Sequence, residues 1–339
     1  MTGAFLSLIE EAYRLDTDDR QWLAALAERA AGMVPTSTGA MAYEFDASDP
    51  AAGVDIPRYA SCSVPDSFVP STLSLNRRTT TEDAARFYHR GIICGTVSEI
   101  LRSSGGSIRT NTAYSNSVAS NGYVDSFGLT ASSPVKRGLV VNAPLEREVT
   151  LNPRAKLAWR EAGVHLQSAY RLRASLRDTP LDPEAVVDAE RGILHCDGEA
   201  KEASIRERLH RAARAVDAAR TRQPSREAHE ALRMWQGLVN GRWTLVESFE
   251  SDGRRFFLAY PNEVAIGNPR ALSGRERAVV GYVVQGDSNK WIAYQLGISA
   301  ATVARHLATA LRKLGLSHRH ELIWLYQSLH GDDPSSKSE

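Results

Sequence analysis

The hydrophobic pattern of this chain is most regular near its C-terminal end, between residues 272 and 325. Apolar residues there recur every three or four positions, the spacing that gives an α-helix one apolar side. Three such runs follow one another closely: Val279, Val280 and Val283; Ile292, Ala293 and Leu296; and Val303, Leu307, Ala310, Leu311 and Leu314. A fourth run covers residues 320–329. We therefore expect an all-α domain of four short helices between residues 268 and 330.

Polar residues mark where these helices begin. Ser273 precedes Glu276 by three residues, which is the capping-box spacing at a helix start. A second helix is expected over residues 289–296 and a third over residues 300–314. The turn Gly297-Ile298-Ser299 joins them, and Ser299 can cap the third helix. Two helices joined by a tight glycine turn form the helix-turn-helix pattern.

The residues of this segment resemble the DNA-binding domain of the LuxR/FixJ/NarL class of bacterial transcription regulators. The matching positions are Leu272, Arg275, Glu276, Gly286, Ser288, Asn289, Lys290, Ile292, Ala293, Leu296, Ile298, Ser299, Thr302, Val303, His306, Lys313, Leu314 and Gly315, followed by Arg319, Glu321 and Leu322. The resemblance implies a double-stranded DNA partner and a third helix that lies in the major groove, where the base edges are distinguishable.

In the resembling family, residues in the first turns of the third helix contact the bases. Here these positions hold Ala300, Ala301, Ala304, Arg305 and Ala308. Relatives often carry lysine at the positions of Ala304 and Ala308, so this chain keeps Arg305 as its main long donor. Arg305 can bond O6 and N7 of one guanine, and the alanines can contact thymine methyl groups. The alternative is that Arg305 touches phosphate alone.

The resemblance also implies phosphate contacts. The matching residues are Lys290, Thr302 and His306, and Arg312 or Lys313 can add to them. Such contacts position a protein on DNA and make its binding salt-dependent. The alternatives are a solvated helix face for Arg312 and Lys313, and a core or capping role for His306.

Two further features concern packing. The last predicted helix carries Leu322, Ile323 and Tyr326, and the corresponding helix of the family pairs two subunits on a two-fold DNA site. The resemblance thus implies a homodimer, the alternative being that this face packs within its own chain. Trp291 stands where the family usually has an acidic residue. We expect it to pack against the sensory part of the chain, with contact to a DNA sugar as the alternative.

Residues 1–177 show an α+β order of elements. Helices are expected at residues 5–15, 18–33 and 153–177, with one or two more in 82–101, interrupted near Gly91 and Gly95. Strands are expected at residues 39–46, 59–64, 125–131 and 138–144. This order resembles GAF-type sensory domains.

Residues 181–262 form a second α+β region. Short strands are expected on either side of Arg191-Gly192, helices at residues 206–222 and 225–238, and a hairpin of strands at residues 241–249 and 254–260. This order resembles a reduced PAS-type domain. The fold class is therefore multi-domain α+β, with GAF-like residues 1–177, PAS-like residues 181–262, a helix-turn-helix domain at 268–330 and a disordered tail at 331–339.

The N-terminal two-thirds offers no recognisable ligand motif, so the cofactor and the ligand-binding residues stay unknown. Receiver-domain and acyl-homoserine-lactone signatures are not recognisable. Aromatic pocket candidates, more often core residues, are Tyr43, Phe45, Tyr59, Phe87, Tyr114, Tyr123 and Phe127. The triplet His195-Cys196-Asp197 suggests catalysis, but neighbouring strand residues point to opposite faces. We expect no catalytic residues, no metal ligands and no enzyme activity.

Charge and cysteine usage add the remaining constraints. The whole chain has a net charge of +1, whereas residues 268–330 hold eight Lys/Arg and three acids, a net charge of +5. A basic domain in a near-neutral chain suggests a polyanionic partner for that domain.

Cys62, Cys94 and Cys196 are isolated, as expected in a reducing cytoplasm. The acidic first residues are unlike a signal peptide, and no apolar run reaches the about 18 residues of a membrane span.

These observations predict a cytoplasmic transcription regulator with no membrane partner. Its N-terminal sensory domains would control DNA binding by the C-terminal domain, in response to a small molecule or a protein. The alternative is control by protein–protein interaction with no small ligand. An enzyme fused to a DNA-binding domain is a further alternative, for which the sequence offers no base or nucleophile.

Overall fold

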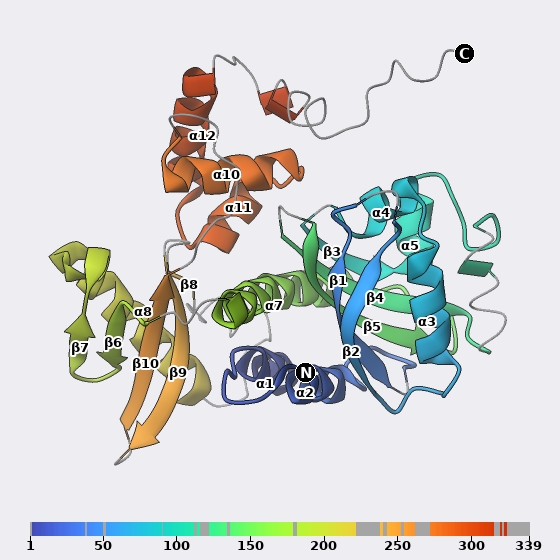
Figure 1. Cartoon of the computed structure of the whole chain (residues 1–339), viewed down its shortest axis with the longest axis horizontal. Coiled ribbons are helices and arrows are strands. Elements are labelled where there is room, and N and C mark those ends of the chain that lie inside the picture. Colours follow the sequence, from blue (N-terminus) through green and yellow to red (C-terminus); the bar gives the residue numbers. More distant parts are fainter. Residues whose placement is uncertain are drawn as a thin grey trace. The chain divides into compact units, whose positions relative to one another are not determined.

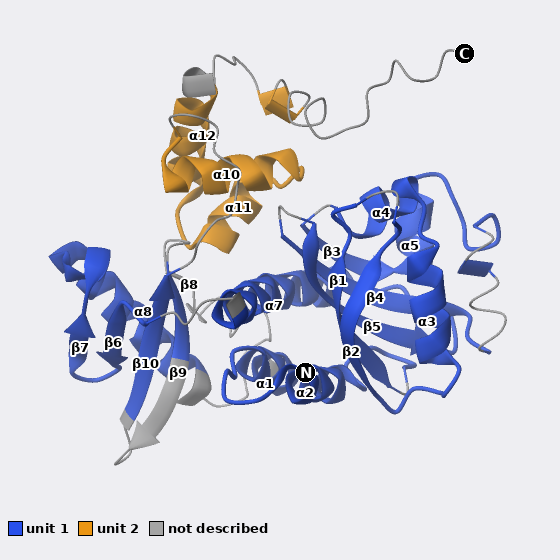
Figure 2. Ribbon diagram, in the orientation of Figure 1, with its two compact units in different colours: residues 1–239, 243–262 blue, residues 240–242, 263–339 orange. Residues whose placement is uncertain are grey.

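The computed structural model of this chain describes most of its residues. The described ranges are 2–37, 39–49, 52–89, 91–111, 114–115, 122–133, 136–178, 182–221, 238–239, 243–251, 254–261, 272–314, 319–320 and 322–323. The chain divides into two compact units (Figure 2). The N-terminal unit comprises Met1–Val239 and Trp243–Asn262, and the C-terminal unit comprises Asn240–Arg242 and Glu263–Glu339. The predicted tail and the predicted helix at 225–238, apart from residue 238, lie outside the described residues.

The N-terminal unit contains two antiparallel sheets (Figure 1). The first has five strands in the order β2-β1-β5-β4-β3. These strands are β1 (Ala40–Asp46), β2 (Asp55–Cys62), β3 (Ile92–Thr96), β4 (Asp125–Ser132) and β5 (Arg137–Leu145). In the middle of the sheet Val140 lies opposite Tyr43 on one side and Thr130 on the other. The four strands predicted from the sequence are confirmed, with β2 beginning earlier than expected.

Helices cover both faces of this sheet. They are α1 (Thr2–Ala12), α2 (Asp19–Ala30) and α7 (Pro153–Asp178) on one side, and α3 (Phe68–Arg77), α4 (Thr81–Phe87) and α5 (Val97–Ser103) on the other. Strand β1 shows why the layers form. Met41, Tyr43 and Phe45 join a buried cluster with the second helix set. The side chain between the last two, Glu44, pairs instead with Arg177 of α7. Alternate strand residues point to opposite faces, so β1 is buried on both.

One segment holds a strand that was not predicted. One or two helices, interrupted near Gly91 and Gly95, were expected within residues 82–101, and the structure has α4 and α5 there with strand β3 between them. Gly91 has a φ of +65°, which breaks the helical course, and the β-branched Ile92 and Ile93 follow it. Thr96 then begins α5 with a capping box to Glu99. Helix α3 was not predicted from the sequence either.

The second sheet has five strands in the order β7-β6-β10-β9-β8. Its elements are β6 (Ala185–Asp188), β7 (Gly192–Cys196), the 3-10 helix η1 (Gly198–Lys201), α8 (Ala203–Thr221), β8 (Leu238–Val239), β9 (Trp243–Ser251) and β10 (Arg254–Pro261). The predicted β6–β7 pair, the helix α8 and the β9–β10 hairpin are confirmed. Assignment of the two sheets to GAF-type and PAS-type domains stays a prediction.

Helix α7 contacts both sheets. It packs on β3, β4 and β5 of the first sheet. At Ser168 its hydroxyl lies 3.0 Å from that of Thr244 in β9, and the contact is buried. Within the described residues, no helix is long and apolar enough to span a bilayer.

A buried ion network fixes the C-terminal end of α7. Glu44 of β1 is 1 % exposed, and it receives bonds from Arg58 of β2, at 3.0 Å, and from two nitrogens of Arg177. Asp19 of α2 pairs with Arg177 at 2.7 Å and with Arg173 at 2.8 Å.

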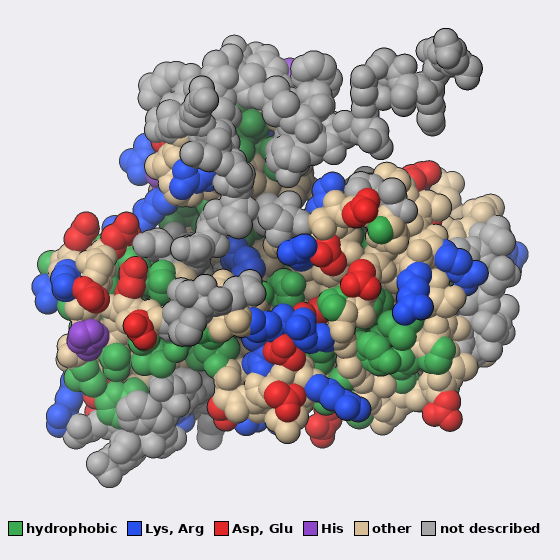
Figure 3. All heavy atoms as spheres, in the orientation of Figure 1, with side chains coloured by type: hydrophobic (Ala, Val, Ile, Leu, Met, Phe, Trp, Pro, Cys, Tyr) green, Lys and Arg blue, Asp and Glu red, His purple; other side chains and the backbone are tan. Residues whose placement is uncertain are grey.

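Elsewhere on this unit, basic and acidic side chains are intermixed on the face drawn in Figure 3.

Replacing the buried carboxylate should destabilise the N-terminal unit. We expect Glu44→Gln to lower the free energy of unfolding by about 2–3 kcal/mol, because two arginines lose their charged acceptor. The effect falls below the ~3–5 kcal/mol of a fully buried pair, because Arg58 is 45 % exposed and can be hydrated. Urea unfolding followed by tryptophan fluorescence measures it. The matched control is Glu207→Gln in an exposed pair with Arg211. Equal effects of the two substitutions would contradict the structural role of Glu44.

Candidate functional site

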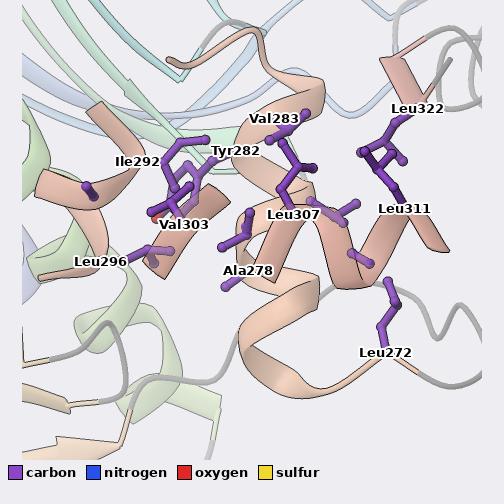
Figure 4. Close-up of a cluster of buried hydrophobic side chains, with 14 residues drawn as sticks. Leu272, Ala278, Tyr282, Val283, Ile292, Leu296, Val303, Leu307, Leu311 and Leu322 are labelled. Carbon is purple, nitrogen blue, oxygen red and sulfur yellow. The ribbon is translucent and has the colours of Figure 1, made fainter. Parts of the chain in front are cut away.

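The C-terminal unit is held together by one apolar cluster. Its helices are α10 (Gly274–Val284), α11 (Asn289–Leu296) and α12 (Ala300–Leu314). Figure 4 shows the buried side chains turned towards one another between these helices; the cluster comprises Leu272, Ala278, Val279, Val280, Tyr282, Val283, Ile292, Ala293, Leu296, Val303, Leu307, Ala310, Leu311 and Leu322. The predicted apolar sides of the three helices are confirmed, except that the side chain of Leu314 lies outside the described residues.

Local hydrogen bonds fix where α10 and α12 begin. The Ser273 hydroxyl accepts the Glu276 N–H at 3.3 Å, and the Glu276 carboxylate accepts the Ser273 N–H at 2.8 Å. At α12 the Ser299 hydroxyl accepts the N–H of Thr302 at 3.1 Å. Gly297 has a φ of +62°, a conformation open to glycine at little cost. The predicted capping box, glycine turn and serine cap are therefore confirmed.

A polar cluster that sequence reasoning missed holds the start of α11. Gln295 donates to the buried carboxylate of Asp287 at 2.7 Å. Arg319 donates to Asn289 Oδ1 at 2.9 Å and to the main-chain carbonyl of Asp287. Arg319 was noted only as a match to the family pattern. The burial of Asp287 and Gln295 has no sequence signal, because both side chains are polar.

The side of α12 that faces away from the apolar cluster is exposed. Ala301, Ala304, Arg305 and Ala308 all lie on it. Their spacing of three, four and seven residues puts them in one stripe along the helix. Lys290, on α11, is also exposed. The structure thus leaves the predicted base-reading residues accessible, with Arg305 as the long side chain of this stripe.

The other predicted phosphate-binding residues differ in their surroundings. The Thr302 hydroxyl is 2.8 Å from that of Ser299, so it shares in the cap of α12. His306 is half-buried. Burial and the charges of Arg275 and Arg305 lower the pKa of His306 below its ordinary value. The lowered pKa disfavours the charged form of this ring in the folded chain. The side chains of Arg312 and Lys313 lie outside the described residues.

Three residues bear on the packing predictions. Trp291 stacks on Tyr294 in the same helix, with ring centroids 5.4 Å apart. Leu322 is 3 % exposed and belongs to the apolar cluster of its own unit, with Ile323 packed against it. The Leu322 side chain thus packs within its own chain, which is the alternative to a contact between two subunits. Tyr326 lies outside the described residues, and the dimer face stays a prediction.

Most of the aromatic pocket candidates of the N-terminal unit meet at one cavity. Tyr43, Phe87, Tyr114, Tyr123 and Phe127 line it. The other two candidates, Phe45 and Tyr59, do not contribute to the lining: Phe45 packs against Tyr88, and Tyr59 is exposed.

The triplet at residues 195–197 does not converge on one point. His195 and Asp197 are exposed, and Asp197 pairs with Lys201 at 2.6 Å. No cluster of His, Cys, Asp and Glu in the described ranges could hold a metal ion.

Acidification should destabilise the C-terminal unit through His306. The pKa of His306 in the folded chain lies below the ordinary value of 6.5, so the unfolded chain binds a proton more readily. Through this residue, the free energy of unfolding does not change with pH well above 6.5, and it falls as the pH drops from 6.5 towards the folded pKa. His306→Gln cannot titrate and should lose less stability than the wild type between pH 7 and pH 5. Calorimetric unfolding of the full chain measures this, with the exposed His195→Gln as control. An unchanged loss in His306→Gln would refute it.

Comparison with known proteins agrees with this geometry. Residues 270–326 match the family model described as "Bacterial regulatory proteins, luxR family". The HTH-type transcriptional regulator MalT of Serratia proteamaculans (strain 568) is 28 % identical over 106 residues, which are 31 % of this chain and 12 % of that protein. The crystal structure of Escherichia coli SdiA aligns with 87 % of this chain and 84 % of its own, at 10 % identity and a TM-score of 0.26, too low to support an argument. Residues 270–326 are a helix-turn-helix domain of the LuxR family.

Proposed function

We propose that this chain is a transcription regulator that binds double-stranded DNA through α12 as a homodimer. The observation that carries the proposal is the exposed stripe of Ala301, Ala304, Arg305 and Ala308, on a helix whose other side is anchored in the domain core. A helix held in this way can enter the major groove without rearranging the domain. The family match over residues 270–326 supports this use of the helix.

Arg305 has the central part in this proposal. Its guanidinium can donate two parallel hydrogen bonds to O6 and N7 of one guanine. The neighbouring alanines are short, so the backbone of α12 can approach the bases closely and their methyl groups can contact thymine. Lys290 and the N-terminal end of α12, with Thr302, supply phosphate contacts that set the register.

The N-terminal unit has the controlling role in this proposal. An input that binds one arrangement of the chain more tightly than another shifts the population towards it, and DNA binding changes accordingly. The buried cavity of this unit, lined by side chains such as Tyr43 and Tyr114, supports a small-molecule input. Location in the cytoplasm is part of the same proposal, because the DNA is there.

Removing the Arg305 side chain should relax sequence discrimination. Binding sites selected from random DNA by the wild type supply the specific sequence, and a scrambled copy supplies the reference. We expect Arg305→Ala to cost about 1–3 kcal/mol on the selected site and much less on the scrambled one, because a base contact carries the sequence information. Fluorescence anisotropy at constant salt measures both affinities.

The control is Lys290→Ala, whose side chain is exposed on the neighbouring helix α11. A phosphate contact is independent of sequence, so its loss should weaken both DNAs alike and reduce the salt slope by about 1. If Arg305→Ala behaved like Lys290→Ala, Arg305 would be a phosphate contact and base reading would have to lie elsewhere on α12. If no DNA were bound at any salt, the proposed function would fail.

Restoring a family lysine should strengthen non-specific binding. Ala304 is exposed on α12, so Ala304→Lys adds a cation to the DNA-facing stripe without disturbing the core. We expect tighter binding to scrambled DNA and a salt slope steeper by about 1, because one more counterion is released. The control is Glu207→Lys, at an exposed site of α8 in the N-terminal unit, which adds charge outside the DNA-binding domain and should leave the slope nearly unchanged. Equal slopes for wild type and Ala304→Lys would contradict the proposed orientation of α12.

A further inference from the structure

The cavity of the N-terminal unit lies between the first sheet and the helices α3 to α5 (Figure 1). Its volume is about 70 Å³, which is roughly five times the 10–15 Å³ that one water needs. About five waters have a liquid volume on the order of 150 Å³, at ~30 Å³ each, and a single six-membered ring displaces about as much. The cavity can therefore enclose a molecule built on one such ring.

Aromatic side chains dominate the wall of the cavity. Two pairs of them already pack ring against ring, because the ring centroids of Phe68 and Tyr123 lie 5.8 Å apart in a T-shaped contact and those of Phe87 and Tyr114 lie 5.4 Å apart. Aromatic rings prefer such tilted or edge-to-face contacts with one another. A further aromatic ring in the cavity would find the same kinds of contact. The aromatic lining side chains of β1, α3, α4 and the segments before β4 are Tyr43, Phe68, Phe87, Tyr88, Tyr114 and Tyr123.

None of the described side chains that face the cavity carries a charge. The described lining residues include no Lys, Arg or His, and their one carboxylate is that of Asp125. Alternate residues of a strand point to opposite faces, so Asp125 shares the α7 face of β4 with Phe127, which packs against Trp159. A charged guest would be buried without a partner for its charge, which is costly. The wall of the cavity therefore favours an uncharged guest.

One edge of the cavity is polar. Ser126 of β4 and Asn142 of β5 are half-buried there, and the Ser126 hydroxyl donates to Oδ1 of Asn142. The carboxamide of Asn142 also carries two N–H donors on Nδ2. Its cross-strand partner is Gly128, where an added Cβ would meet no heavy atom within 4 Å. Open space thus lies beside an amide that can bond a guest.

The other polar groups of the wall are largely engaged with one another. The hydroxyls of Tyr43 and Tyr88 bond each other at 3.1 Å. Tyr88 donates to Asn76, whose amide donates to the carbonyl of Thr72 at 2.9 Å. A guest with one polar group is therefore directed towards Asn142 rather than towards this chain of hydrogen bonds.

We propose that this cavity binds a small uncharged phenol, with its ring among the aromatic side chains and its hydroxyl bonded to the Asn142 amide. A phenol combines the two features that the wall demands, one aromatic ring and one hydroxyl. A hydrocarbon would leave the Asn142 amide without a bond, and an aliphatic alcohol would lose the ring contacts. The proposal rests on the proposed function in one respect, because it names the chemistry of the input that controls DNA binding.

Two substitutions separate the parts of this site. Gly128→Val places a larger side chain in the open space and should close the cavity, and a β-branched residue suits a strand. Asn142→Leu keeps the approximate shape of the side chain and removes its hydrogen-bonding groups. The matched control is Gln21→Leu, which removes an exposed amide from α2.

Isothermal titration calorimetry of the full chain tests the proposal with three probes of similar size. Phenol should bind, toluene about tenfold more weakly because it lacks the hydroxyl, and cyclohexanol about tenfold more weakly because it lacks the aromatic ring. Asn142→Leu should weaken the binding of phenol about tenfold and leave that of toluene unchanged. Gly128→Val should abolish the binding of all three, and Gln21→Leu should bind them as the wild type does.

No binding of phenol, equal affinity for phenol and either of the other probes, or an Asn142→Leu variant that keeps the preference for phenol would each overturn the proposal. If Asn142→Leu did not fold, failure of Gly128→Val to block phenol would overturn it instead.

The DNA assay separates this inference from the proposed function. Phenol binding without any change in DNA affinity would uphold the site and refute its role as the controlling input. DNA binding without phenol binding would refute the site alone. Phenol binding by a chain that binds no DNA would refute the proposed function and uphold the site.

Discussion

The N-terminal unit depends on a charge that its own fold takes out of water. Glu44 sits in a strand buried on both faces, where an unpaired carboxylate would be prohibitively costly. Arg58 from β2 and Arg177 from α7 supply the compensation. The pairing therefore fixes the end of α7 against the sheet, and Asp19 repeats the arrangement with Arg173 and Arg177. Such a network stabilises little compared with apolar packing of the same volume, but its geometry tolerates one position of the helix.

The position of α7 matters because this helix contacts both sheets of the N-terminal unit. Its middle part packs on the first sheet, and Ser168 meets Thr244 of the second in a buried contact. The cavity lies on the other face of the first sheet, among Tyr43, Thr130 and Val140. These three residues are cross-strand partners, so a guest that moves one strand acts on its neighbours and on the helix behind them. Close packing transmits such shifts because interior voids are few. Close packing thus connects the residues around the cavity with α7 and, through Ser168, with the second sheet.

The helix-turn-helix domain could be predicted from sequence because its information is local. Ser273 with Glu276, and the turn at Gly297, fix helix ends within three or four residues of themselves. The cavity could not be predicted in this way. Its wall is formed by residues from distant parts of the chain, such as Tyr43 of β1, Phe68 of α3 and Tyr114. Strand β3 was overlooked because five residues between two helices carry too little periodicity to identify a strand.

The composition of the exposed stripe limits how the C-terminal domain can recognise its DNA. One bidentate arginine contributes about 1–3 kcal/mol of discrimination. Two protomers of the proposed dimer would reach about 2–6 kcal/mol, against the about 4–10 kcal/mol that separates specific from non-specific binding in known regulators. In the proposed complex the remainder comes from thymine contacts at Ala301, Ala304 and Ala308 or from DNA shape. Because one protomer of the proposed dimer contributes so little discrimination energy, specific DNA binding would depend strongly on dimerisation. An N-terminal unit that sets the spacing of the two copies would therefore have strong control over DNA binding.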